Sequence, residues 1–203
     1  MKPTSPAPTS RKLVLGIMVI LALWLAALLI FASWFQGRYI HAYTEYSPEF
    51  LKASYTEQWF RQLTALLPPK TTASRVIQFW QPDCLCNRFA RRHALSATNI
   101  AKELNIEHIT IIPQSAKHTL TSLQILNPNT KIITLAPKLL AKWPSSPTLL
   151  IEGPLAQLLY FGPLGFGAFC SQSSTSIIDG QLRSLQPRPF YNVIGKGCFC
   201  PWK

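Results

Sequence analysis

The chain has 203 residues, of which 48% are hydrophobic, 11% aromatic and 14% charged, and its formal net charge is +12. This length allows one ordinary domain with an appendage, and the composition is that of a folded chain rather than a disordered one. The basic residues are not interleaved with aromatic residues in the pattern that binds nucleic acid, so nucleic acid is not expected as a partner. A generally basic surface and a contact with anionic lipid headgroups both remain open.

Residues 13–35 carry no charge and are apolar almost throughout. A helix of about 20 apolar residues spans the hydrocarbon core of a bilayer, so we expect a transmembrane anchor here. A cleaved signal peptide is the alternative, but its apolar region is usually only about 7–15 residues long. More basic residues precede the segment (Lys2, Arg11 and Lys12) than closely follow it (Arg38 alone). This asymmetry predicts a cytoplasmic N-terminus and a C-terminal domain outside the cytoplasm.

Helical and strand patterns alternate beyond the apolar segment. A linker is followed by an amphipathic helix that begins at Ser47-Pro48-Glu49, where Ser suits the N-cap and Pro the first helical position. Apolar, β-branched runs then predict strands, and apolar residues at helical spacing predict helices. The expected elements are a strand at 75–80, helix 87–104, strand 106–112, helix 115–126, strand 131–135, short helix 137–143, strand 148–152, strand 156–161 and helix 168–185. Residues 186–203 lack periodicity and are expected to form an irregular tail.

Strands that alternate with helices predict a mostly parallel sheet with helices on both faces. The last two expected strands flank Gly153-Pro154, which favours a turn, so they should form an antiparallel hairpin at the edge of the sheet. Glu152 lies beside this turn and is expected to be exposed. The fold class is therefore α/β, preceded by one transmembrane helix.

All five cysteines lie beyond the apolar segment, on the side of the membrane where disulfides persist: Cys84, Cys86, Cys170, Cys198 and Cys200. Two bridges would leave one thiol over, and the spacing does not decide which cysteines pair. Four of the cysteines form two Cys-x-Cys motifs, one at Cys84 and Cys86 and one at Cys198 and Cys200 near the end of the chain.

Two stretches resemble the thioredoxin-like superfamily over about residues 70–187. They are Phe79-Trp80-Gln81-Pro82-Asp83-Cys84, ahead of a helix, and Ser146-Pro147-Thr148, ahead of an apolar strand. The resemblance implies a thioredoxin-like mixed sheet, a redox-active Cys84, a cis Pro147 that faces it, and substrate contacts from Trp80, Ser146 and Pro147.

Residues 163–203 resemble an uncharacterised bacterial family of membrane-anchored thioredoxin-like proteins. This resemblance implies a single-pass protein of the bacterial inner membrane, with its C-terminal domain in the periplasm. Two positions depart from the thioredoxin pattern. Asn87 stands where the second family cysteine should fall, and Gln78 stands where the family has a buried acid. An amide cannot accept a proton as a carboxylate does, so ordinary thioredoxin chemistry is not expected.

The first Cys-x-Cys motif suits redox chemistry. A thiolate on Cys84 would lie at the positive end of a helix, near Arg88, Arg91 and Arg92, and such surroundings favour a reactive thiolate. Cys84 is thus the expected nucleophile. Cys86 would resolve the mixed disulfide or form a strained, easily reduced Cys84–Cys86 bridge.

The tail cysteines have several interpretations. Cys170, Cys198 and Cys200 could form structural disulfides that tie the tail to the domain, or a second thiol pair that resolves intermediates. Alternatively, Cys84, Cys86, Cys198 and Cys200 could bind copper or zinc, because soft thiolates select Cu(I) and Zn(II). His93 lies two helical turns beyond Cys86 and is expected to be a solvated surface residue.

Three functions follow from these patterns. The preferred one is a thiol–disulfide oxidoreductase without a cofactor, whose partners are protein thiols and disulfides. The others are a thiolate metal carrier and a non-enzymatic scaffold stapled by disulfides. The expected organisation is a cytoplasmic tail (1–12), an anchor (13–35), a linker and amphipathic helix (36–69), a thioredoxin-like domain (70–187) and a cysteine-containing tail (188–203).

Overall fold

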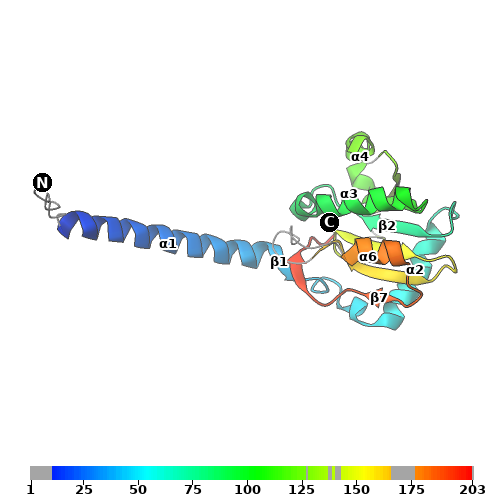
Figure 1. Cartoon of the computed structure of the whole chain (residues 1–203), viewed down its shortest axis with the longest axis horizontal. Helices are drawn as coiled ribbons and strands as arrows, with labels where there is room; N and C mark the ends of the chain where they lie inside the picture. Colours follow the sequence, from blue (N-terminus) through cyan, green and yellow to red (C-terminus); the bar gives the residue numbers. More distant parts are fainter. Residues whose placement is uncertain (1–10, 127, 137–138, 140–142, 166–176, 203) are drawn as a thin grey trace, which may run out of the picture. The chain divides into compact units, whose positions relative to one another are not determined.

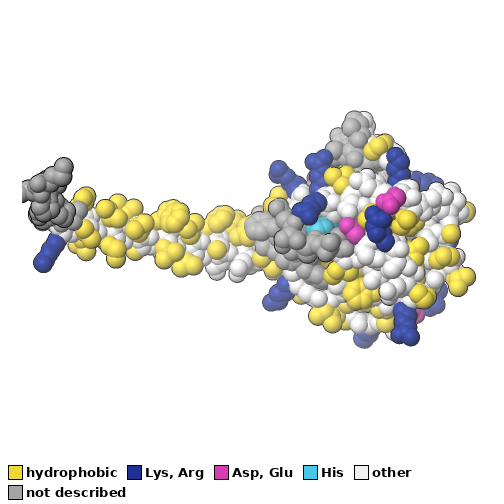
Figure 2. All heavy atoms as spheres, viewed as in Figure 1, with side chains coloured by type: hydrophobic (Ala, Val, Ile, Leu, Met, Phe, Trp, Pro, Cys, Tyr) yellow, Lys and Arg dark blue, Asp and Glu magenta, His cyan; other side chains and the backbone are white. Residues whose placement is uncertain are grey.

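The computed structural model describes residues 11–126, 128–136, 139, 143–165 and 177–202. The chain divides into two compact units, Met1–Arg38 and Tyr39–Lys203. The first contains most of helix α1 (Arg11–Tyr39). Within it, Leu13–Arg38 has a mean hydropathy of 3.0 and is long and apolar enough to cross a membrane, judged by length and composition alone. Its large apolar side chains are exposed, and Figure 2 shows them along the face in view, an arrangement that suits a hydrocarbon surrounding.

The second unit, in which Figure 1 labels β2 and β7, is built on a six-stranded sheet in the order β4-β3-β2-β5-β6-β7. The strands are β2 (Arg75–Phe79), β3 (Glu107–Pro113), β4 (Lys131–Leu135), β5 (Thr148–Glu152), β6 (Leu158–Pro163) and β7 (Phe190–Tyr191). β2, β3 and β4 are parallel, whereas β5 is antiparallel to both β2 and β6. The expected parallel sheet and hairpin are present. The hairpin is not the edge, because β7 pairs in parallel with β6.

Helices cover both faces of this sheet. The helical segments of this unit are η1 (Pro48–Leu51), α2 (Ala53–Leu66), α3 (Leu85–Glu103), η2 (Gln114–Thr119), α4 (Leu120–Leu126) and α6 (Ile177–Ser184). Successive side chains of a strand point to opposite faces, so Ile77 and Phe79 pack in the α2-side cluster while Val76 packs in the α3-side cluster.

The two faces differ in the side chains that fill them. On the α2 side, aromatic rings interlock, for instance Trp59 against Phe79 and Phe161. On the other side, α3 presents four small buried residues at helical spacing, and α6 contacts α3. These residues are Ala90, Ala94, Ala97 and Ala101. Small side chains let α3 lie close to the sheet, which fixes where the helix begins relative to the end of β2.

The order of elements and the geometry of one proline define the fold. A parallel β2-α3-β3 unit precedes an antiparallel hairpin, and the peptide bond Ser146–Pro147, immediately before β5, is cis. This is the thioredoxin-like arrangement, so the expected fold class and the cis Pro147 are both confirmed.

The segments that flank the sheet differ from the sequence prediction. α1 continues through Tyr39, and β1 (Ile40–Ala42) then pairs antiparallel with β8 (Lys196–Cys198). The tail is therefore not irregular, since it contains β7 and β8. Both strands are very short and pair with distant segments, so local periodicity could not reveal them. Ser47 begins the 3-10 helix η1, and the α-helix itself starts at Ala53.

Two expected helices lie partly outside the described residues, at 137–143 and 168–185. In the second of these, the described part contains α6. Glu152 was expected to be exposed, and this prediction is wrong, since only 3% of it is exposed. Its carboxylate lies 3.3 Å from Lys70 Nζ and 3.7 Å from Arg75 Nη1, so burial is tolerated because the charge is paired.

Candidate functional site

Cys84 lies between the end of β2 and the start of α3. Its backbone N–H donates to Gln81 O at 2.9 Å, and its own carbonyl accepts from Asn87 N at 3.1 Å, which starts the helix. Cys84 is therefore the N-cap residue of a long helix, as the sequence predicted. Backbone N–H groups of the first turn point toward this position and favour negative charge there. Arg88 and Arg91 are exposed on the following turns.

Each cysteine of the first motif is bonded to a cysteine of the tail. Cys84 is joined to Cys200 and Cys86 to Cys198, with Cα–Cα distances of 5.9 and 5.2 Å. The two Cys-x-Cys segments thus lie antiparallel. The structure contains these two bridges rather than a Cys84–Cys86 bridge. The tail is tied to the domain, as one interpretation held, but through Cys84 and Cys86. Cys170 lies outside the described residues.

The two bridges touch each other. Cys86 Sγ lies 3.7 Å from Cys200 Sγ, and the sulfurs of Cys84, Cys86 and Cys200 lie within 4.8 Å of one another. Cys84, Cys86 and Cys198 are 3%, 1% and 0% exposed, whereas Cys200 is only partly buried. A compact cluster of sulfur atoms therefore opens toward solvent at one residue. Sulfurs this close could hold a soft metal ion if the bridges were reduced.

The cis-proline loop holds the backbone of the tail. Ser146 N donates to Cys200 O and Cys200 N donates to Ser146 O, both at 2.9 Å, which makes an isolated antiparallel bridge. The carbonyl oxygen of Ser146 also lies 3.8 Å from Cys84 Sγ. Ser146 does face Cys84, and the chain that it contacts is the protein's own C-terminal segment.

Asn87 stands at the position of the second family cysteine, and its side chain forms hydrogen bonds there. It is buried, its side-chain amide donates to Gln81 O, and its Oδ1 accepts from Ser146 Oγ at 3.2 Å. Gln81 N in turn donates to Ser146 Oγ at 3.0 Å. The first turn of α3, the Gln81 corner and the cis-proline loop are therefore joined by side-chain hydrogen bonds, a role that sequence reasoning missed.

The other expected site residues have packing roles. Trp80 is half-buried and packs against the α3-side cluster. Gln78 is buried within β2, so no carboxylate lies at that position of the strand. His93 is also buried, and the expectation that it is solvated is wrong. Its place on α3, one residue before Ala94, puts it beside the face that packs on the sheet, which the local sequence pattern did not indicate.

Aromatic residues near both ends of the second unit support the tail. Tyr43 packs edge-on against Phe199 with ring centroids 5.2 Å apart, and its hydroxyl forms a hydrogen bond with Thr148 Oγ1 at 2.7 Å. Burial raises the pKa of Tyr43 well above its usual value, so this hydroxyl stays protonated. Trp202 Nε1 donates to Pro144 O at 2.8 Å. The tail is thus held by packing and hydrogen bonds as well as by disulfides.

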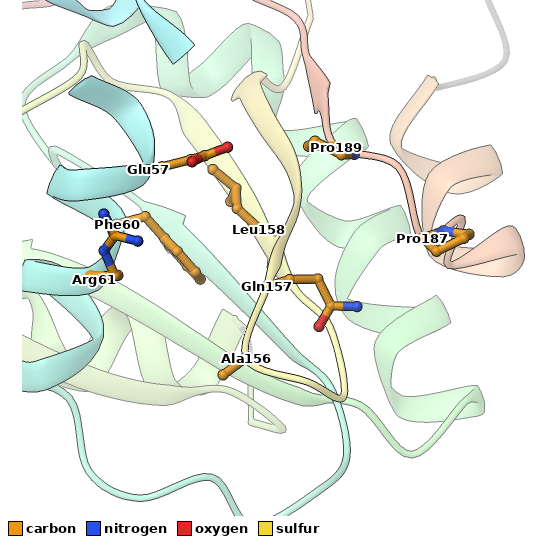
Figure 3. Close-up of a pocket in the computed structure, with 8 residues that line it drawn as sticks. All are labelled: Glu57, Phe60, Arg61, Ala156, Gln157, Leu158, Pro187 and Pro189. Atoms are coloured by element: carbon orange, nitrogen blue, oxygen red, sulfur yellow. The ribbon is translucent and has the colours of Figure 1, made fainter. Parts of the chain in front are cut away.

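A separate pocket of about 320 Å³ lies away from the cysteines (Figure 3). Glu57, Phe60 and Arg61 of α2 face the turn that precedes β6 across it, and two prolines of the segment before β7 complete it. No cysteine lines this pocket. It holds both an acidic and a basic group but no feature that links it to the sulfur cluster.

The fold and the cysteine cluster define a thioredoxin-like protein whose Cys-x-Cys site is closed by its own tail. The chain belongs to a family described as a domain of unknown function, DUF6436, which matches residues 56–202. The family match includes both Cys-x-Cys motifs. No curated protein matches the sequence.

Three solved structures are similar to the chain. One is a secreted disulfide oxidoreductase of Mycobacterium tuberculosis, described as homologous to E. coli DsbE, with 17% identity over 55% of this chain and 81% of that one, at a TM-score of 0.40. The second is a hypothetical protein from Sinorhizobium meliloti, with 12% identity over 64% and 80% of the two chains, at a TM-score of 0.46. The third is an uncharacterised conserved protein from Geobacillus kaustophilus, with 15% identity over 64% and 77%, at a TM-score of 0.45.

Proposed function

We propose that this protein is a membrane-anchored thiol–disulfide oxidoreductase that acts on protein thiols and disulfides through Cys84. The observation that carries the proposal is the Cys84–Cys200 bridge, which lies at the N-terminus of α3 and against the cis-proline loop. A helix N-terminus stabilises the thiolate that exchange requires. The hydrogen bonds of Asn87 and Ser146 fix the start of α3 relative to the cis-proline loop.

The reduced protein would reduce a substrate disulfide in two exchange steps. One thiolate of the reduced Cys84 and Cys200 pair attacks a substrate sulfur, forms a mixed disulfide and releases the other substrate sulfur as a thiolate. The second thiolate of the pair then attacks the protein sulfur of the mixed disulfide, which restores the Cys84–Cys200 bridge and releases the second substrate thiolate. The substrate gains two electrons and the protein loses two. Cys200 takes the role that was expected for Cys86, because Cys200 is the bonded partner of Cys84.

Cys86 has a supporting role in this scheme. Its bridge to Cys198 keeps the tail attached while the Cys84–Cys200 bridge is open. Cys84 and Cys200 therefore stay close together in the reduced state, and the resolving step remains intramolecular.

The proposed location is the bacterial inner membrane, with the N-terminus in the cytoplasm and the second unit in the periplasm. The apolar segment of α1 and the excess of basic residues before it support this orientation. The two disulfides agree with an oxidising compartment.

The test is the reduction of a peptide disulfide reporter by the full-length protein in detergent, with dithiothreitol as the electron source. Wild type is expected to exceed the dithiothreitol background, whereas Cys84→Ser should fall to that background because the Cys84–Cys200 bridge can no longer form. The matched control is a Cys86→Ser/Cys198→Ser double variant, which keeps the Cys84–Cys200 pair and should retain activity. Equal rates for wild type and Cys84→Ser would leave the bridges as structural staples of a scaffold.

A second candidate function is the binding of copper or zinc by the reduced cysteines. The short distances among the three sulfurs of Cys84, Cys86 and Cys200 favour it. Soft thiolates prefer Cu(I) among the metals available to such a site. The protein would be reduced under anaerobic conditions, mixed with Cu(I) or Zn(II), and passed over a desalting column. Metal that fails to stay with the protein in both cases would exclude this function.

A further inference from the structure

We propose that a substrate thiol enters the oxidised site at Cys200, with Cys84 as the leaving sulfur. This inference rests on the proposed oxidoreductase function and concerns the reaction in the oxidising direction, in which the closed Cys84–Cys200 bridge accepts electrons from a substrate with two thiols. It assigns a catalytic role to a residue of the C-terminal segment rather than to the Cys-x-Cys motif at the helix start.

The two cysteines of the bridge differ in how deeply they are buried. Cys84 is 3% exposed and its Sγ lies 3.8 Å from Ser146 O, under the tail. Cys200 is only partly buried, unlike the other three bonded cysteines. An attacking thiolate must touch the sulfur that it attacks, so the difference in burial between the two residues favours attack at Cys200.

Cys86 Sγ does not occupy the position from which a thiolate would attack Cys200. Exchange is fastest when the nucleophile approaches in line with the bond that breaks, on the side of Cys200 Sγ opposite to Cys84. Cys86 Sγ is 3.7 Å from Cys200 Sγ, but it lies to the side of the Cys84–Cys200 bond. An in-line position would put Cys86 Sγ farther from Cys84 Sγ than the 4.8 Å within which the three sulfurs lie.

The leaving sulfur is the one that the fold stabilises as an anion. Attack at Cys200 releases a thiolate on Cys84, the N-cap residue of α3, where the helix dipole and unpaired N–H groups favour negative charge. Attack at Cys84 would release a thiolate on Cys200, which belongs to an extended segment paired with Ser146 and is not itself the N-cap residue of the helix. A more stable leaving thiolate leaves faster.

The tail stays in place while its sulfur carries the substrate. The Cys86–Cys198 bridge and the two backbone hydrogen bonds between Ser146 and Cys200 do not involve the bond that breaks. Phe199 remains buried against Tyr43. A second substrate thiolate then attacks the substrate sulfur of the mixed disulfide and releases Cys200. The substrate loses two electrons and becomes a disulfide, and Cys84 and Cys200 become thiolates.

The experiment maps the mixed disulfide formed with glutathione. The oxidised full-length Cys86→Ser/Cys198→Ser variant, in detergent, is mixed with reduced glutathione, quenched early with acid, alkylated with N-ethylmaleimide and sequenced by mass spectrometry. Each Cys-x-Cys segment of this variant holds a single cysteine, so the assignment is unambiguous. We expect glutathione on Cys200 and the alkyl group on Cys84, in at least a tenfold excess over the reverse.

A predominance of glutathione on Cys84 would overturn the assignment, and so would similar amounts on the two residues. The wild-type chain is mapped in parallel, because an adduct on Cys86 or Cys198 there would show that the other bridge opens first and would also overturn it. This outcome is distinct from failure of the proposed function, which the reporter assay with Cys84→Ser decides independently. If neither bridge reacts with glutathione, the assignment of Cys200 fails, and the reporter assay still decides the proposed function.

Discussion

Asn87 changes the chemistry at the position where the thioredoxin pattern has its second thiol. Its buried amide joins Gln81 O and Ser146 Oγ, so a residue that cannot exchange disulfides instead orients the loop that faces Cys84. A hydrogen bond of this kind typically contributes about 1 kcal/mol, and leaving a buried partner unpaired costs about 1–3 kcal/mol. The partner thiol is then supplied by the tail, at Cys200.

His108 makes stability depend on pH. Burial lowers its pKa from 6.5 to about 4, and its Nδ1 lies 3.2 Å from Thr130 Oγ1. The unfolded chain binds a proton near pH 6.5 and the folded chain does not, so this contribution is complete above pH 6.5 and is lost as the pH falls toward 4. We expect a loss of about 3 kcal/mol over that interval.

Urea unfolding of the full chain at pH 7.5 and pH 4.5 measures this effect. His108→Gln cannot titrate and should show a smaller loss between the two pH values. An unchanged pH dependence in His108→Gln would show that other groups cause it.

At the scale of elements, β7 extends the sheet beyond the predicted hairpin because a glycine of β6 lets the neighbouring segment come close. Asn192 follows β7, and its N–H donates to Phe161 O at 2.7 Å. A Cβ on Gly162 would lie 2.6 Å from the carbonyl oxygen of Asn192. Gly162 thus allows the close pairing of the two strands.

A pair of glycine substitutions tests this explanation. Gly162→Ala should destabilise the protein by about 1–3 kcal/mol, because the new methyl group overlaps the backbone of the neighbouring segment. Gly180→Ala makes the same chemical change within α6, where no atom lies within 4 Å, and should stabilise by up to about 1 kcal/mol through helix propensity. Denaturant midpoints of the two variants should move in opposite directions. A shift of Gly162→Ala in the stabilising direction would contradict the close approach.

For the molecule as a whole, the two disulfides close almost the same loop. Their sequence separations are 116 and 112 residues. A loop of about 100 residues gives a bridge a stabilisation of about 4.7 kcal/mol by restricting the unfolded chain. Once one bridge is present, however, the second closes only a ring of a few residues and should contribute about 2 kcal/mol.

The bridges should therefore be non-additive. Removal of either pair, as Cys84→Ala/Cys200→Ala or Cys86→Ala/Cys198→Ala, should cost about 2 kcal/mol, because the remaining bridge still closes the long loop. Removal of all four cysteines should cost about 2–3 kcal/mol more than the sum of the two pairs. Unfolding in urea without reductant measures all three. Additive losses would mean that the bridges do not share one loop in the unfolded state.

The sequence alone determined those features that local pattern encodes. Charge-free apolar length predicted the segment that becomes most of α1, and alternating periods of 2 and 3.6 predicted β2, α3, β3, β4, β5 and β6. The apolar strand, the turn and the first cysteine, taken with Ser146-Pro147, indicated a thioredoxin-like fold with Cys84 at a helix start. The cis form of Pro147 followed from the resemblance rather than from the residues themselves.

Only the tertiary structure decided how the cysteines pair and which polar groups are buried. Cys84 is bonded to Cys200, more than a hundred residues away in the chain. Glu152 pairs with Lys70 across about eighty residues, and β1 pairs with β8 across about a hundred and fifty. A short segment such as Lys196–Cys198 forms a strand only because a partner lies beside it. Local periodicity reports which face of an element is buried. It cannot report which distant element covers that face, because contacts of that kind form only when the whole chain folds.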